Sequence, residues 1–191
     1  MPKTNYHLLS ENPAERRFLG KAPIKFVTAL FFFRKGSSFR KVLHELKYNG
    51  RKDVGVILGK YAAFDLLHIP AIASVDYIVP IPLHPKKLKK RTYNQSEQIA
   101  IGLSSVLGTQ IDTKNLIRIH NNTSQTSKSA SERYKNTEGI FRTIDKEFFK
   151  HKHILLVDDV LTTGATLEAC IKALLQTENI TISIFTLAVT E

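Results

Sequence analysis

The sequence predicts an α/β fold in which a mostly parallel sheet is flanked by helices. Short apolar segments typical of strands alternate along the chain with longer segments of helical spacing. The segment 154–157 is continuously apolar, as expected of a strand buried on both faces of a parallel sheet. A chain of 191 residues, 42% of them apolar, is long enough for one substantial domain with a small N-terminal arm or hood region.

The first half of the chain begins with a polar segment, residues 1–25, whose three prolines and lack of periodicity predict an extended arm. The first helix is the clearest element, because Phe39, Val42, Leu43 and Leu46 share one face and Asn49-Gly50 ends it. The expected strands are 27–33 and 75–82, and the expected helices are 39–49, 54–67 and 96–107. Between the strand 75–82 and the helix 96–107, residues 86–91 are expected to form a basic loop.

The second half repeats the alternation of strands and helices. Its expected strands are 116–119, 139–144, 153–158 and 180–189, and its expected helices are 131–136 and 165–176. Residues 120–128 are rich in Asn, Thr and Ser and are expected to form a mobile loop.

Composition narrows the class of partner. The net charge of +11 favours an anionic partner, which could be nucleic acid, a phosphorylated metabolite or a membrane surface. Cys170 is the single cysteine, so neither an intrachain disulfide nor a cysteine-based zinc site is expected. The apolar stretch 26–33 is too short to span a bilayer and no leader is apparent, which predicts a cytoplasmic protein without membrane insertion.

The segment 154–166 carries the strongest chemical signal. A buried strand is followed by two carboxylates, Asp158 and Asp159, at the strand end where open α/β sheets place their ligands. Gly164 permits a tight turn, after which loop amides and a helix N-terminus would converge on one anion site. The threonine hydroxyls add neutral donors suited to a monophosphate, and the carboxylates would accept hydrogen bonds from ribose hydroxyls.

Familiar nucleotide-binding motifs and a purely structural turn both fit this segment less well. The chain has neither the G-x-G-x-x-G fingerprint nor a Walker A loop. An acidic turn before a capped helix would explain one Asp and one capping Thr. It would not explain two adjacent acids followed by three threonines and a glycine.

Residues 158–166 resemble the 5-phosphoribosyl-1-diphosphate (PRPP) signature of type I phosphoribosyltransferases. The wider pattern is similar to the ComF family (ComFC/GntX-like), often called amidophosphoribosyltransferase-like. The supporting segments are 46–50 (LKYNG), 79–85 (VPIPLHP), 91–95 (RTYNQ) and the spaced series Gln125, Arg133, Asn136, Gly139, Phe141. The resemblance covers about residue 29 to the last residue.

Two departures from the family pattern affect the expected domains. Members commonly begin with a four-cysteine zinc module, whereas this chain opens about where that module would end. Residues 1–28 are therefore expected to be an arm left after a missing zinc module, and 29–191 the phosphoribosyltransferase-like domain. Thr92-Tyr93 stands where Gly-Phe is frequent, which keeps the aromatic side chain.

The resemblance implies a type I phosphoribosyltransferase fold that binds PRPP with Mg²⁺ held by the ligand and by no direct protein ligand. A nucleophile would displace diphosphate at C1 of the ribose, with Asp158 and Asp159 as the catalytic residues. The 5-phosphate would be bound by Leu161, Thr162, Thr163, Gly164, Ala165 and Thr166. The diphosphate would be bound by Pro80, Ile81, Pro82 and Arg91, although 80–82 could also be an ordinary strand end closed by prolines.

Three further groups have alternative interpretations. Gln125, Arg133 and Asn136 would belong to a flap over the site. Alternatively, Ser131 caps a short surface helix, and Arg133 and Asn136 hold the base of the flap. Lys86, Lys87, Lys89 and Lys90 could attract diphosphate or nucleic acid, or form a solvated basic face. Lys47 and Tyr48 end the first helix, where a cation complementing the helix dipole competes with a ligand role.

A non-catalytic role competes with the enzyme. ComF-like proteins are associated with natural competence, so the chain could be an accessory protein in DNA uptake that binds single-stranded DNA, a partner helicase, or both. The net charge and the lysine cluster fit this role. The sequence leaves open the acceptor, turnover and the oligomeric state.

Overall fold

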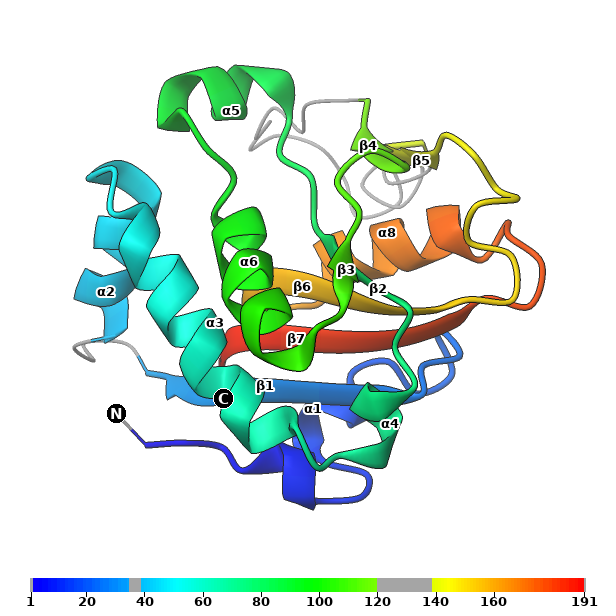
Figure 1. The fold of residues 1–191 in the computed structure, drawn as a ribbon, viewed down its shortest axis with the longest axis horizontal. Coiled ribbons are helices and arrows are strands. Elements are labelled where there is room, and N and C mark those ends of the chain that lie inside the picture. The colour runs from blue at the N-terminus through cyan, green and yellow to red at the C-terminus, as the bar shows by residue number, and fades with distance from the viewer. Residues whose placement is uncertain (1, 35–38, 120–138, 191) are drawn as a thin grey trace, which may run out of the picture.

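The computed structural model describes residues 2–34, 39–119 and 139–190. Its main sheet has five strands in the order β1-β7-β6-β2-β3, and every neighbouring pair is parallel (Figure 1). These strands are β1 (Phe26–Phe33), β7 (Thr181–Thr190), β6 (His153–Leu161), β2 (Tyr77–Pro80) and β3 (Gln110–Ile111). A separate antiparallel pair is formed by β4 (Leu116–Arg118) and β5 (Phe141–Thr143).

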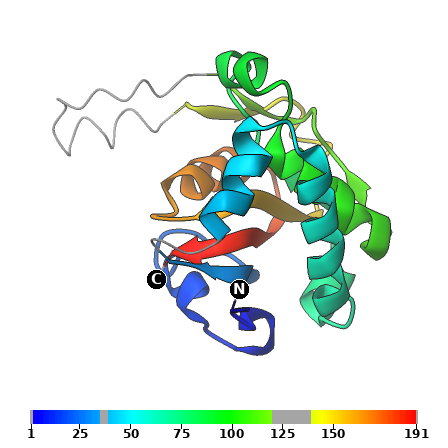
Figure 2. The same ribbon diagram turned by 90° about the vertical axis from the view of Figure 1, so that its left-hand side faces the viewer.

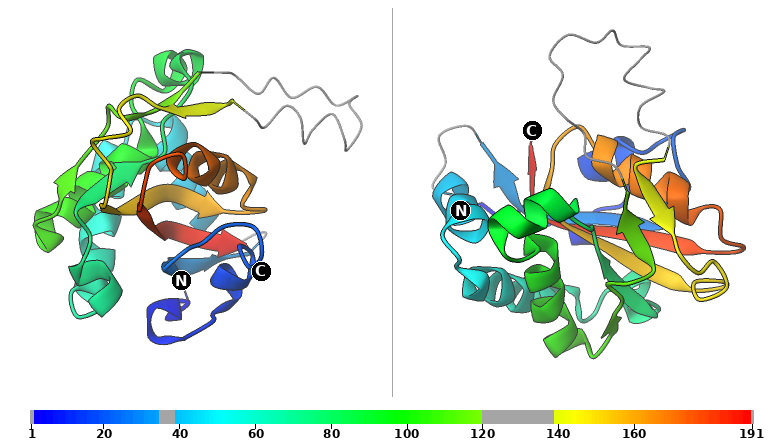
Figure 3. Two further views of the ribbon diagram at one scale, coloured as in Figure 1. Left: turned by 90° about the vertical axis from the view of Figure 1, so that its right-hand side faces the viewer. Right: turned by 90° about the horizontal axis from the view of Figure 1, so that it is seen from above.

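Helices cover both faces of the sheet, as the sequence predicted (Figure 2). One face carries α2 (Phe39–Tyr48), α3 (Lys52–Leu66) and α6 (Gln95–Leu107), and the other carries α8 (Ala165–Leu174). The N-terminal segment, with η1 (Tyr6–Leu8) and α1 (Pro13–Arg16), lies on the same side as α8 (Figure 3). The short helices are α4 (Pro70–Ala73) and α5 (Pro85–Arg91). No helix in the described ranges is long and apolar enough to cross a membrane.

Side chains of the central strand β6 pack alternately into two separate hydrophobic cores, one on each face of the sheet. Ile154 and Leu156 pack into the core on the α8 side, whereas Leu155 and Val157 pack into the core under α3 and α6. All four are fully buried, which explains the continuous apolar run in the sequence.

Helices α3 and α6 pack unusually close together at two glycines. A Cβ atom built on Gly102 would lie 2.2 Å from the Val56 carbonyl oxygen and 2.9 Å from the Gly59 Cα. The neighbours are backbone atoms, so only glycine fits at this crossing. The contact holds α6 against α3 and thereby fixes the position of the N-terminus of α6.

The structure corrects two sequence predictions near the signature. Strand β6 was expected to end at Asp158, but it continues to Leu161 because β7 continues to pair with it, through Val160↔Ala188 and Leu161↔Val189. The segment 86–91 is the helix α5 rather than a basic loop. His84 Nδ1 accepts a hydrogen bond from the Lys86 N–H at 3.2 Å, and Pro85 takes the first helical position.

The N-terminal segment is more structured than the expected extended arm. Asn12 and Glu15 form a capping box for α1, and Asn12 Nδ2 also donates to the Val27 carbonyl oxygen at 2.8 Å. Tyr6, Ala14 and Phe18 are buried in the core on the α8 side. The expected boundary between residues 28 and 29 falls inside strand β1.

Candidate functional site

The loop between β6 and α8 encloses a small cavity of about 40 Å³. Gly164 has a φ of 86° and is the N-cap of α8, and its carbonyl oxygen accepts from the Glu168 N–H at 2.8 Å. Leu161 and Leu167 are buried and anchor the two ends of the loop, whereas the three threonines between them are exposed. The cavity is lined by Asp158, Val160 and every residue from 161 to 167. The structure thus brings together the whole set that the sequence assigned to a phosphate.

The two acidic residues beside this loop are held by different partners. Asp158 Oδ1 accepts hydrogen bonds from Ser96 Oγ at 3.0 Å and from the Asp159 N–H at 2.8 Å. Asp159 Oδ2 lies 2.9 Å from Lys47 Nζ in an ion pair whose side chains are only 14% and 24% exposed. Among the described residues, Asp158 Oδ2 and Asp159 Oδ1 accept no protein hydrogen bond. Each carboxylate therefore keeps one oxygen available as an acceptor.

The electrostatic environment makes the two carboxylates unlike. Burial is the main reason that the pKa of Asp158 is raised to about 7, and the neighbouring Asp159 charge raises it further. The Asp159 N–H, the Ser96 hydroxyl and the Lys47 charge act in the opposite direction. A carboxyl group with a pKa near neutrality beside a paired carboxylate is typical of ligand sites that use charge.

Residues 80–82 lie next to the acidic pair, but their backbone is already engaged. Pro80 pairs with Val157 in the sheet, and the Ile81 N–H donates to the Val157 carbonyl oxygen at 2.9 Å. The Ile81 carbonyl oxygen accepts from Asn94 Nδ2 at 3.0 Å. Proline has no N–H, so in this arrangement 80–82 offer no backbone donor to a diphosphate. The first N–H of this loop that the sheet does not use is that of Leu83.

Cationic side chains from three elements gather on the same side. Arg91, at the end of α5, has its guanidinium carbon 5.2 Å from the centre of the Tyr48 ring, and Tyr48 follows Lys47 on α2. Burial and then the charge of Arg118 on β4 lower the pKa of Lys87 on α5. Burial also lowers the pKa of Arg118, and the charge of Asp158 acts on it in the opposite direction. Arg91 thus contacts Tyr48, the residue that follows the Lys47 paired with Asp159.

The remaining predicted residues divide between structure and surface. Gln125, Arg133 and Asn136 lie outside the described residues. Lys86, Lys89 and Lys90 are exposed on α5. Tyr93 and Asn94, from the RTYNQ segment, are buried: Tyr93 donates to the Leu46 carbonyl oxygen, and Asn94 caps α6. This segment therefore positions α6.

The sequence did not single out Ser96 or Arg118, and it favoured a dipole role for Lys47. Ser96 and Lys47 contact the acidic pair from segments distant in sequence, and Ser96 and Asp158 are 62 residues apart. Arg118 lies close enough for the charge of Asp158 to act on its pKa. The only local signal was that Ser96 follows the RTYNQ segment and that Lys47 belongs to LKYNG.

Comparison with known proteins gives a family match that includes the two acidic residues and the loop 161–166. The sequence model of the family described as phosphoribosyl transferase domain matches residues 94–189, half of the chain. "DNA utilization protein YhgH" of Escherichia coli O157:H7 is 28% identical over 149 residues, 76% of this chain and 65% of that protein. "Competence protein F" of Haemophilus influenzae is 32% identical over 100 residues, 52% of this chain and 44% of that protein. The chain spans less than two thirds of the length of these relatives.

Two solved structures show a partial likeness to this chain. The glutamine PRPP amidotransferase from B. subtilis, complexed with ADP and GMP, is 16% identical, covering 74% of this chain and 30% of that one with a TM-score of 0.45. A purine phosphoribosyltransferase from Pyrococcus horikoshii Ot3 is 19% identical, covering 69% of this chain and 82% of that one with a TM-score of 0.42. From the family match, which includes α6, the acidic pair and the loop 161–166, the chain belongs to the phosphoribosyl transferase domain family, as a ComF-like member of the type I group.

Proposed function

We propose that this chain binds PRPP together with Mg²⁺ and transfers the phosphoribosyl group to a nucleophile, with release of diphosphate. The observation that carries the proposal is the shared cavity, because Asp158 lines the same cavity as the threonine loop. A ligand that fills this cavity with a phosphate would place the attached sugar beside the acidic pair. The proposal includes a cytoplasmic location.

Each part of the site has a role in this proposal. The loop 161–166 holds the 5-phosphate through its backbone N–H groups and threonine hydroxyls. Asp158 Oδ2 and Asp159 Oδ1 accept hydrogen bonds from the two ribose hydroxyls. Their negative charge then stabilises the positive charge that develops on the sugar as the bond from C1 to diphosphate breaks. Arg91 attracts the departing diphosphate.

The described residues fit a magnesium ion that arrives with the ligand. Asp159 Oδ2 already faces Lys47 Nζ, and the two free oxygens of the acidic pair bind the ribose hydroxyls in this proposal. Mg²⁺ is commonly bound through substrate phosphates rather than in an all-protein cage. When bound, it would neutralise charge on the diphosphate and make it a better leaving group.

Titration calorimetry and thermal shift with Mg²⁺-PRPP test the proposal on the wild type and on the double variant Asp158→Asn/Asp159→Asn. We expect binding to the wild type, loss of PRPP binding in the double variant, and diphosphate release when an amine or base acceptor is supplied. An unchanged response of the double variant to Mg²⁺-PRPP would refute the site assignment.

A second candidate function is binding of single-stranded DNA, alone or with a partner helicase. The supporting observations are the net charge of +11, the exposed Lys86, Lys89 and Lys90 on α5, and the names of the two relatives. If this function holds, the affinity for single-stranded DNA falls steeply as the salt concentration rises. Replacing Lys86, Lys89 and Lys90 by Gln should reduce the slope of log binding constant against log salt concentration by about two to three. If the wild type binds single-stranded DNA with a steep salt dependence but gives no thermal shift with Mg²⁺-PRPP, this role is favoured over the enzyme.

A further inference from the structure

The N-terminal segment makes a direct contact with the phosphate loop. The guanidinium group of Arg17 donates from Nη1 to the Thr162 carbonyl oxygen and from Nη2 to the Thr190 carbonyl oxygen. Nη1 also lies 3.3 Å from Thr190 Oγ1. One arginine therefore joins the loop after β6 to the end of β7, which is the neighbouring strand.

Two more side chains of this segment contact the same loop and the helix that follows it. The Phe18 ring is buried, and its edge lies 3.6 Å from where a Cβ on Gly164 would stand. Lys21 Nζ lies 3.0 Å from Glu168 Oε1 in the first turn of α8. Glu168 would repel an anion at this helix N-terminus, and the Lys21 ammonium partly neutralises it.

We infer that residues 17–21 position the phosphate loop, with Arg17 as the main positioning residue. The peptide between Thr162 and Thr163 is planar and trans, so its N–H points opposite to its C=O. Because Arg17 holds the Thr162 carbonyl oxygen, the Thr163 N–H is turned away from Arg17, and both Thr162 and Thr163 line the phosphate cavity. This role rests on the proposed function, since it concerns the affinity of that cavity for a phosphorylated sugar.

The segment remains attached without these contacts. Asn12 binds the Val27 carbonyl oxygen, Glu15 Oε1 accepts from the Val27 N–H at 3.2 Å, and Tyr6 and Ala14 are buried. Arg17 can therefore be replaced while the segment stays docked on β1.

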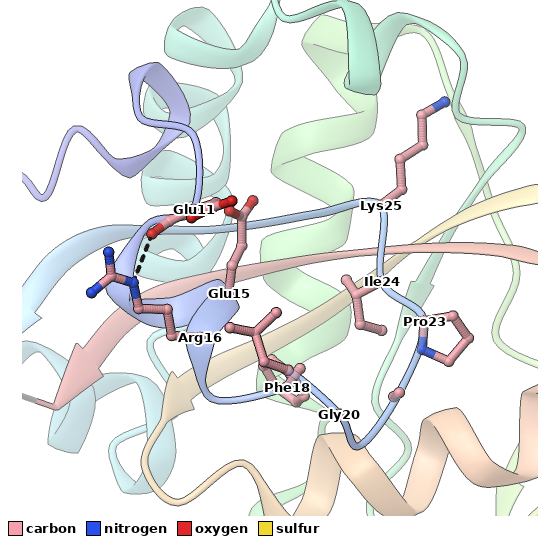
Figure 4. Close-up of a pocket in the computed structure, with 10 residues that line it drawn as sticks. Glu11, Glu15, Arg16, Phe18, Gly20, Pro23, Ile24 and Lys25 are labelled. Carbon is pink, nitrogen blue, oxygen red and sulfur yellow. Dashed lines mark hydrogen bonds between the residues drawn. The ribbon is translucent and has the colours of Figure 1, made fainter.

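A neighbouring arginine provides a matched control. Arg16 lies in α1 and donates from Nε to the Glu11 carbonyl oxygen at 3.2 Å, within its own segment (Figure 4). Together with Phe18 and Lys25 it lines a cavity of about 270 Å³. Replacing Arg16 removes the same charge as replacing Arg17 but leaves the Thr162 carbonyl contact in place.

The experiment compares Arg17→Met with Arg16→Met by calorimetry, using ribose 5-phosphate and, separately, Mg²⁺-diphosphate. For Arg17→Met we expect about tenfold weaker binding of ribose 5-phosphate, because a looser loop is less often in the binding conformation. We expect unchanged diphosphate binding in both variants. Equal affinity of Arg17→Met and wild type for ribose 5-phosphate would overturn the inference, as would an equal loss for both ligands.

Two further measurements keep the inference testable. Lys21→Met should weaken the binding of ribose 5-phosphate about threefold. If Arg17→Met fails to fold, an affinity of Lys21→Met for ribose 5-phosphate equal to that of the wild type overturns the inference. If the wild type binds neither ribose 5-phosphate nor PRPP, the proposed function fails. Amide hydrogen exchange over 162–166 then decides the inference: faster exchange in Arg17→Met than in Arg16→Met supports it, and equal rates refute it.

Discussion

Replacement of Asp158 by Asn should remove a loss of stability that the unliganded protein undergoes as the pH rises from about 4 to 8. The folded state raises the pKa of this carboxyl group from 3.8 to about 7, mainly through burial. Because the folded protein binds this proton more tightly than the unfolded chain, the wild type loses stability as the pH rises from about 4 to above 7. Asparagine has no proton to lose, and its Oδ1 can still accept from Ser96 Oγ and the Asp159 N–H.

The structure gives the size of the effect. The interval from 3.8 to about 7 corresponds to about 4 kcal/mol at 1.36 kcal/mol per pH unit. The Asp158 side chain retains some solvent contact, which screens the charge, so we expect about 2 kcal/mol. The stability of the wild type minus that of the variant should therefore fall by about 2 kcal/mol between pH 4 and pH 8.

Denaturation with urea at several pH values measures this difference directly. Taking the difference cancels groups common to both proteins, including His153, whose pKa is lowered by burial and then by the charge of Lys25. Ser105→Ala is the control, because it changes no ionisable group, and its difference from wild type should stay flat with pH. A wild-type minus Asp158→Asn difference that is flat, or that rises with pH, would refute the electrostatic account of the site.

Three more substitutions follow from the described contacts. Lys47→Met leaves the Asp159 carboxylate without a cation and should weaken the binding of Mg²⁺-PRPP about tenfold, as measured by calorimetry. Lys41→Met, at an exposed position on the same helix, should leave this affinity unchanged. Equal affinities of Lys47→Met and wild type would show that the ion pair is irrelevant to binding. Gly102→Ala pushes α6 away from backbone atoms of α3 and should lower the melting temperature by about 6 °C. The control Ser105→Ala, on the same helix, should lower it by about 1 °C or less. A melting temperature of Gly102→Ala equal to that of the wild type would contradict the close packing. Among the described residues, the buried Gln95 Nε2 has no hydrogen-bond partner, so Gln95→Met should raise the free energy of unfolding by about 1 kcal/mol. A fall of that size in urea titrations would be contrary to this reasoning.

The elements of the sheet were largely predictable from sequence because their signals are local. The run 154–157 and the glycine at 164 specify a strand, a turn and a helix within a dozen neighbouring residues. Helix α5 was missed because its sequence is dominated by exposed cations, with only Leu88 as an apolar residue. Its start is nevertheless encoded locally, by the His84 side-chain cap and Pro85.

The partners that shape the site could not be predicted in the same way. Ser96, Lys47 and Arg17 contact it only after the chain has folded, and Arg17 and Thr162 are 145 residues apart. A serine after a helix cap, a lysine at a helix end and an arginine just after a short helix are each common on protein surfaces. Their roles depend on the order of strands, which sequence periodicity does not specify.

The position of β7 has a consequence for how this protein is made in the cell. The strand comes last in the described chain, yet it lies between β1 and β6 and is the sheet neighbour of both. During synthesis, β1 therefore waits for about 150 residues before its strand partner emerges, and its apolar side chains remain without their final neighbours. We expect this chain to acquire its sheet only after synthesis of β7, and nascent chains that stop before residue 181 to depend on chaperones for solubility.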